Sequence, residues 1–369
     1  MIATRLLVIV SVMSAFLGSA TGDPKREDAV NFPSRHAWDL FLLVNHPAMD
    51  PIKCHCRGVP DPAKSVGTPG TTSVWETWRL SSTEVLLNPA VKPPDWNDTS
   101  LPGGPVNGKV PEEPKPALLA RLAGAARLPK PQMHILFDPN DGIFQGHGQF
   151  GESRMNEATY NFVRNNDLYS VEGQIRNAAK YVGGKMPAIA LPLDSMEVKA
   201  AWVELSDADI AAGKDHQYYV AEYKGKKYGL ATLHIITKDI PNWFWATFHH
   251  VDNPPGGAET PDTYGRPHEL DNTVWRNYVL GGTQTDFVDS IGRPTLLSDS
   301  LVEKDIEQSS CISCHARATV AAVGVSHVGS KPVVGAPNPL EYETNGKPSL
   351  LQTDFLFSIV VRAHSEKGD

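Results

Sequence analysis

Two thiols and an imidazole stand close together near the carboxyl end of the chain, in the run Cys311-Ile312-Ser313-Cys314-His315. Thiols at positions i and i+3 on one helical turn can reach both vinyl groups of a haem, and the next imidazole can take an axial position on its iron. The spacing therefore predicts one covalent haem c, with Cys311 and Cys314 as thioether anchors and His315 as the proximal iron ligand. The alternatives are a disulfide or a redox dithiol, and zinc is disfavoured because no second cysteine pair stands at finger spacing.

The sequence restricts where a second iron ligand can come from. All seven methionines precede Cys311, so the chain lacks the downstream methionine of a small electron-transfer cytochrome c. The distal ligand must then come from the amino-terminal part, or be His327 or His364, or the position must be open. Two candidates are Met155, whose alternative role is core packing on an amphipathic helix, and His250, two residues before Asp252, whose carboxylate could fix the tautomer of the imidazole. A methionine ligand raises the iron potential, a second histidine lowers it, and an open position permits peroxide or oxygen chemistry.

The two remaining cysteines, Cys54 and Cys56, flank a single histidine in the amino-terminal part of the chain. In an oxidising compartment they could form a small disulfide, bind copper or another soft metal, or supply a reactive thiol. A second covalent haem is disfavoured because the two-residue gap between the thiols is missing. The sequence leaves their role open.

The 369 residues carry 34 lysines and arginines against 42 aspartates and glutamates, a formal net charge of −8. So acidic a chain is a poor candidate for binding the phosphate backbone of nucleic acids. Residues 1–22 place Arg5 before an apolar stretch and a run of small residues, which is typical of a secretory signal peptide. No later apolar run approaches the roughly 20 residues that span a bilayer. We therefore expect a periplasmic or secreted protein with no membrane span once the leader is cleaved.

Thirty glycines and thirty prolines disfavour an all-helical bundle. Ten of the prolines fall within residues 89–131, which we interpret as a surface excursion or a linker. Apolar spacing predicts two helices between residues 153 and 182, and a change of period then predicts strands. The further expectations are strands over 198–205, 217–223 and 228–237 with a hairpin between the last two, a core aromatic cluster over 243–248, a helix capped by Ser300 and Glu303, and a helix or strand over 355–361.

These features together predict an α+β fold, with a β-rich body and helices packed around a carboxyl-terminal haem segment. We expect a signal peptide over residues 1–22, a mixed α/β body over 23–295 that contains the excursion 89–131, and a haem-attachment segment over 296–369. The haem segment should be continuous with the body.

Several landmarks besides the attachment motif are spread over most of the mature chain. They are Trp38 with Asn45-His46-Pro47, Arg57-Gly58-Val59-Pro60-Asp61, Val74-Trp75-Glu76-Thr77-Trp78, Arg154-Met155-Asn156, the run from Trp245 to Asn253, and the run from Ser310 to Ala316. In these landmarks the chain resembles a large group of exported bacterial cytochrome c family proteins. The resemblance implies one continuous architecture with a single haem, and it places Met155 and His250 in segments that the group retains. It implies no substrate and gives no role to Cys54 and Cys56.

Two classes of function remain. The first is electron transfer, with a redox partner protein or a small molecule as electron donor or acceptor. The second is a haem enzyme of peroxidase or oxygenase type, or a gas-binding protein, with an open distal iron site; a mature chain of about 340 residues around one haem favours this class. For a distal acid–base pair, the residues that we can nominate are His250, Asp252 and Arg154. Nucleotide binding and serine hydrolysis have no support, because no phosphate loop and no nucleophile elbow is present.

Overall fold

The computed structural model describes most of the chain beyond the predicted leader. The predicted leader over residues 1–22, the part of the proline-rich excursion beyond residue 98, and His327 lie outside the described residues. Within the described part, no helix has both the length and the apolar character that crossing a membrane requires. The described residues are 24–98, 149–223, 225–253, 256–303, 306–326 and 334–367.

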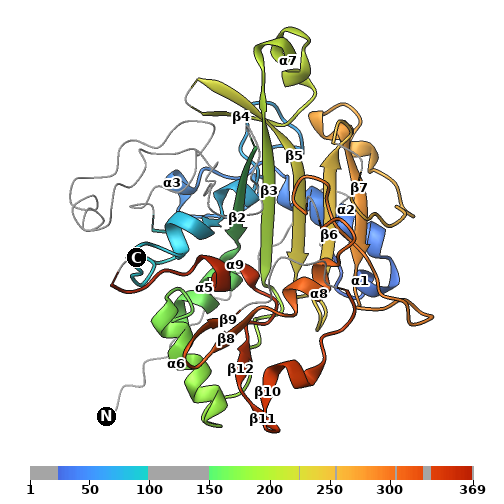
Figure 1. Ribbon diagram of the computed structural model, residues 1–369. Helices are drawn as coiled ribbons and strands as arrows, with labels where there is room; N and C mark the ends of the chain where they lie inside the picture. Colours follow the sequence, from blue (N-terminus) through green and yellow to red (C-terminus); the bar gives the residue numbers. More distant parts are fainter. Residues whose placement is uncertain are drawn as a thin grey trace, which may run out of the picture.

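A seven-stranded antiparallel sheet forms the body of the protein (Figure 1). Neighbouring strands follow the order β1-β2-β3-β5-β6-β7, and β4 pairs with β5 outside this path. Helices accompany the sheet, so the predicted α+β class with a β-rich body is confirmed. The strands are β1 (Arg79–Leu80), β2 (Gln149–Met155), β3 (Met196–Leu205), β4 (Val220–Tyr223), β5 (Lys226–Thr237), β6 (Phe244–His250) and β7 (Tyr278–Gln284).

The predicted hairpin is confirmed, because β4 and β5 pair antiparallel from Val220 with Gly229 to Tyr223 with Lys226. A glycine with φ of 77° follows β4 in the connecting turn, at Gly225, in the left-handed region that glycine adopts without steric cost. Residues typical of strands on both sides of a short turn that contains glycine are local signals, and here the tertiary structure follows them.

The prediction that Met155 lies on a helix is wrong. Met155 is the last residue of β2, where it pairs with Arg79 on one side and with Glu197 on the other. Helix α5 starts two residues later, and the Asn156 side chain caps it by accepting a hydrogen bond from the Thr159 amide at 3.1 Å. The helical spacing of apolar residues in this segment includes Met155. Pairing with β1 and β3 nevertheless makes the residues up to Met155 a strand.

The sheet has helices on both faces (Figure 1). Side chains alternate along β6, so Phe244 and Phe248 point to one face while Trp245 and Thr247 point to the other. On the first face, Phe41 of α2 packs 4.5 Å from Phe248, measured between ring centroids. Helices α8 and α9 cover part of the opposite face, and the run after Asp354 thus forms a helix rather than a strand. These helices are α2 (Pro33–Val44), α8 (Cys311–His315) and α9 (Phe357–Arg362).

The remaining α-helices and strands are mostly short. One buried cluster includes side chains of the body, such as Phe248, and side chains that follow residue 296, such as Ile312 and Ile359. The carboxyl-terminal segment therefore shares its core with the body. The smaller elements are α1 (Asp28–Asn31), α3 (Pro51–Cys54), α5 (Glu157–Asn165), α6 (Val171–Val182), α7 (Asp207–Ala211), β8 (Thr319–Ala321), β9 (Gly324–Ser326), β10 (Glu343–Thr344), β11 (Lys347–Pro348) and β12 (Leu350–Gln352).

The capped helix predicted at Ser300 is also wrong. Glu303 does accept a backbone hydrogen bond through Oε2, at 2.7 Å, but the donor is the amide of Asp299. The Asp299 carboxylate in turn accepts hydrogen bonds from the amides of Leu301 and Val302. The described residues after this turn are not helical, and the following helix, α8, begins at Cys311.

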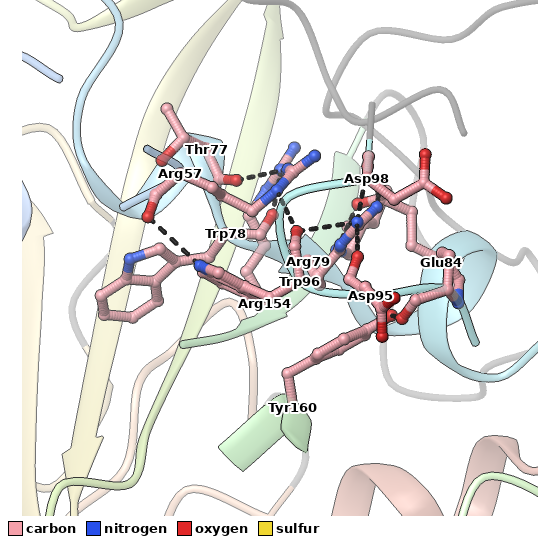
Figure 2. Close-up of polar contacts among 12 residues, drawn as sticks. Arg57, Thr77, Trp78, Arg79, Glu84, Asp95, Trp96, Asp98, Arg154 and Tyr160 are labelled. Carbon is pink, nitrogen blue, oxygen red and sulfur yellow. Dashed lines mark hydrogen bonds and ion pairs between the residues drawn. The ribbon is translucent and has the colours of Figure 1, made fainter. Parts of the chain in front are cut away.

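Buried arginines attach the amino-terminal segment to the sheet edge formed by β1 and β2 (Figure 2). Arg79 and Glu84 are both fully buried and their side chains lie 3.1 Å apart, and Arg154 pairs with Glu152 at 2.8 Å. Backbone carbonyl groups accept further hydrogens of the guanidinium groups: Arg79 donates to Asp95, Trp96 and Asp98, Arg154 to Glu76 and Trp78, and Arg57 to Thr77 and Trp96. These contacts hold the segment from residue 57 to residue 98 against the sheet.

Glu84→Gln should lower the free energy of unfolding by about 3 kcal/mol, because it leaves the Arg79 guanidinium buried without its counter-charge. As a control, Glu222→Gln at an exposed position on β4 should change stability by less than about 0.5 kcal/mol. Urea unfolding of the two variants measures the difference. Equal stabilities would contradict a contribution from the buried pair.

Candidate haem-binding site

The first turn of α8 is held by the end of β7. The Gln284 side chain donates from Nε2 to Ser310 Oγ at 2.7 Å and accepts from the Ile312 amide through Oε1 at 3.0 Å. Ser310 caps the helix by accepting from the Ser313 amide. The turn that carries Cys311 and the residues after it therefore has a defined position on the sheet.

A cavity of about 150 Å³ lies between the sheet and helices α8 and α9. Cys311, Cys314 and His315 all line it, so the structure brings the three predicted attachment residues to one space. The remaining walls come from the sheet, from α9 and from the turn at Glu303. Among these wall residues are Lys199, His234, Trp245, Glu303, Phe357 and Arg362.

The imidazole of His315 has a defined orientation. Its Nδ1 lies 2.9 Å from the carbonyl oxygen of Phe355, and because that oxygen can only accept, Nδ1 carries the proton. The ring packs edge-on against Trp245, with the centroids 4.7 Å apart. Burial lowers the pKa of His315 to about 4, although the bond to Phe355 opposes the shift. The ring is therefore neutral near pH 7 and its Nε2 keeps the lone pair that an iron ligand needs.

Cys311 and Cys314 are free thiols that are not bonded to each other. The Cys311 thiol donates to the carbonyl oxygen of Leu297 at 3.0 Å. Burial raises the pKa of Cys311 well above its usual value and also raises that of Cys314, and the charge of Glu303 acts in the same direction. A reactive redox thiol has a lowered pKa, so this environment does not favour the dithiol alternative.

Two cross-strand rows of side chains form the floor of the cavity. Glu197, Ile236 and Trp245 occupy adjacent positions on β3, β5 and β6 in one row. Lys199 and His234 occupy the next row, together with Thr247. Residues directly opposite each other on antiparallel strands share a face, so these side chains point toward α8 and α9.

His234 is not among the site residues predicted from the sequence. It is buried, with 9% of its surface exposed. In the sequence it is a polar residue between Leu233 and Ile235, which reads as an outward-facing position of a strand. The available signal is that successive side chains of a strand point to opposite faces. His234 therefore lies on the face opposite Leu233, the same face as Lys199. Because α8 and α9 cover that face, the position lies in the cavity.

Neither of the two predicted distal ligands lines the cavity. Met155 is fully buried in the core. His250 stacks on Tyr218 with the centroids 3.6 Å apart, and both of its ring nitrogens are occupied. Nε2 lies 3.1 Å from the carbonyl oxygen of Gln217, and Nδ1 accepts from the amide of Asp252 at 3.1 Å. The geometry therefore gives His250 a structural role, and it leaves the nomination of His250, Asp252 and Arg154 as an acid–base set without support at this cavity.

Cys54 and Cys56 form a disulfide across His55. His55 has a φ of 51° and ends the short helix α3. Of the alternatives open from the sequence, the structure has the small disulfide. Neither cysteine lines the cavity at α8.

Two carboxyl groups at the cavity have raised pKa values. Burial raises the pKa of Glu197 to about 7, against a hydrogen bond that Ser358 Oγ donates to it at 3.0 Å. Burial likewise raises the pKa of Glu303 to about 7, and the positive charge of Lys199 opposes that shift. Both groups can therefore exchange protons near neutral pH.

No family model, curated protein or solved structure matches the chain. Among the described residues there is also no cluster of three or more histidine, cysteine or acidic side chains that could hold a metal ion by itself. A haem brings its own four in-plane nitrogens and needs one or two ligands from the protein. The donor set at the cavity has the composition for such a group: two free thiols, a neutral imidazole with an available Nε2, and the cations Lys199 and Arg362.

Glu197→Gln should alter how stability depends on pH. The folded state holds the Glu197 proton up to about pH 7, whereas the unfolded chain releases it near 4.5. The stabilising contribution of this group is therefore complete below pH 4.5 and is lost as the pH rises through 7. The free energy of unfolding of the variant, compared with that of the unchanged chain, should therefore rise by up to about 3 kcal/mol between pH 5 and pH 8.

Urea unfolding at several pH values measures this gain, in protein produced without haem attachment. Glu204→Gln, at the other end of β3, serves as the control and should run parallel to the unchanged chain. Parallel curves for Glu197→Gln as well would contradict the expected acidity of Glu197.

Proposed function

We propose that this chain is an exported monohaem c-type cytochrome that takes part in electron transfer. The observation that carries the proposal is that Cys311, Cys314 and His315 open onto one cavity, while the Phe355 carbonyl holds His315 with Nε2 available. The resemblance to exported bacterial cytochrome c family proteins and the leader-like residues 1–22 support the same assignment. The electron donor or acceptor is a redox partner protein or a small molecule.

The described residues have complementary roles toward such a group. Cys311 and Cys314 would anchor it as thioethers, and His315 would be its proximal ligand. Lys199 and Arg362 are the cations at the cavity suited to its two propionate groups. Trp245 supplies an apolar wall beside His315. In the haem-loaded protein this wall would keep water from the iron and would tune its potential. The bound haem would supply one-electron transfer between ferrous and ferric iron.

A second candidate function is a haem enzyme or a gas-binding protein with an open distal site. The observation in its favour is the pair of carboxyl groups at the cavity, Glu197 and Glu303, each with a pKa of about 7. A general acid or base works best when its pKa lies near the working pH. Carbon monoxide binding separates the two functions, because a closed six-coordinate iron does not bind it.

Covalent haem attachment tests the proposal directly. The chain is produced with the haem c maturation machinery and extracted with acid–acetone, which removes haem that is not covalently bound. We expect one haem per chain to stay with the unchanged polypeptide. Cys314→Ala should abolish stable covalent haem, because it removes one of the two thioether anchors.

The matched control replaces the other two cysteines, Cys54→Ser with Cys56→Ser, and should keep covalent haem. Full retention of haem by Cys314→Ala, or no covalent haem on the unchanged chain, would overturn the proposed function.

A further inference from the structure

His234 enters the same cavity as His315, but from the opposite wall. It lies on β5, in a cross-strand row between Lys199 and Thr247. His315 belongs to α8, which covers this face of the sheet. The two imidazoles therefore approach one space from two different layers of the protein.

The ring nitrogens of His234 differ in their surroundings. Nδ1 lies 3.0 Å from Thr247 Oγ1, which can accept a hydrogen bond from it. Nε2 is buried and has no hydrogen-bond partner among the described residues. A buried polar atom without a partner is rare in folded proteins and calls for a ligand, an ion or a water molecule at that position. With the proton on Nδ1, Nε2 has a free lone pair.

Trp245 links the positions of the two imidazoles. His234 pairs with Thr247, and Trp245 is two residues along the same strand and on the same face. Such diagonal neighbours lie roughly 7–8 Å apart. The His315 ring contacts Trp245 directly, with the centroids 4.7 Å apart. His234 and His315 are thus neighbours of one buried indole.

We propose that His234, through Nε2, is the second axial ligand of the haem iron. This inference rests on the proposed function and makes it more specific. His234 then takes the place predicted from the sequence for Met155 or His250, neither of which lines the cavity. A second imidazole closes the iron to small ligands and lowers its reduction potential compared with a methionine ligand. It therefore favours electron transfer over the open-site alternative.

The test compares spectra of the haem-loaded chain and of His234→Ala, each with and without carbon monoxide. The unchanged chain should be low-spin in both oxidation states and should not bind carbon monoxide. His234→Ala should become high-spin and bind carbon monoxide, and added imidazole should restore the low-spin spectrum. His249→Ala is the matched control: this histidine lies on the same sheet but outside the cavity, with Nε2 3.1 Å from Glu259, and its loss should leave the spectrum unchanged.

Two further measurements apply if His234→Ala does not fold. Near-infrared magnetic circular dichroism of the unchanged protein distinguishes two imidazole ligands from an imidazole with a thioether. Thr247→Val removes the partner of His234 Nδ1 and preserves the side-chain shape, so it should keep the low-spin state and raise the midpoint potential. An unchanged potential in this variant would count against the assignment.

The outcomes separate this inference from the proposed function. An unchanged chain without covalent haem overturns the proposed function. A haem-loaded chain that is already high-spin, that carries a thioether signature, or that keeps its spectrum in His234→Ala overturns the assignment of His234 alone.

Discussion

The hydrogen bond from His315 Nδ1 to the carbonyl oxygen of Phe355 determines which ring nitrogen keeps a free lone pair. That carbonyl is aimed by a backbone in which Asp354 and Phe355 both have positive φ, at 49° and 69°. This region costs a side-chain-bearing residue roughly 1–2 kcal/mol. Asp354 offsets the cost through its carboxylate, which accepts from the Leu191 amide at 2.7 Å and from Lys238 Nζ at 2.6 Å. Contacts made far along the chain thus fix the direction of the candidate iron ligand.

The chemistry of the cavity follows from covering both faces of an antiparallel sheet. Such sheets commonly leave one face in water, with polar side chains at alternate positions. Here α8 and α9 cover that face, so Glu197 and His234 are buried although their positions alternate with core residues. Burial disfavours their charged forms, which raises the pKa of the carboxyl group and lowers that of the imidazole. The packing of α8 and α9 on this face therefore accounts both for the raised pKa of the carboxyl group and for the neutral form of the imidazole.

The parts of the structure that could be predicted are those determined by neighbouring residues. The spacing of Cys311, Cys314 and His315 predicts a helical turn, and α8 is that turn. The β4–β5 hairpin is local in the same sense. Met155 could not be placed this way, because its strand is determined by pairing with β1 and β3. His234 was missed for a related reason. Alternation along the strand predicts which face it lies on, but the sequence of the strand does not predict that a segment near the carboxyl end covers that face.

The two candidate iron ligands come from different parts of the chain. His315 belongs to the carboxyl-terminal segment and His234 to the centre of the sheet, while the seven methionines all precede Cys311. A haem segment with its own downstream ligand could bind haem as a small separate module. In this chain the attachment turn is held by Gln284 of β7, and the opposite wall of the cavity is the sheet. The body is therefore part of the candidate haem site. A chain shortened to residues 296–369 would keep Cys311 and Cys314 without the wall that carries His234.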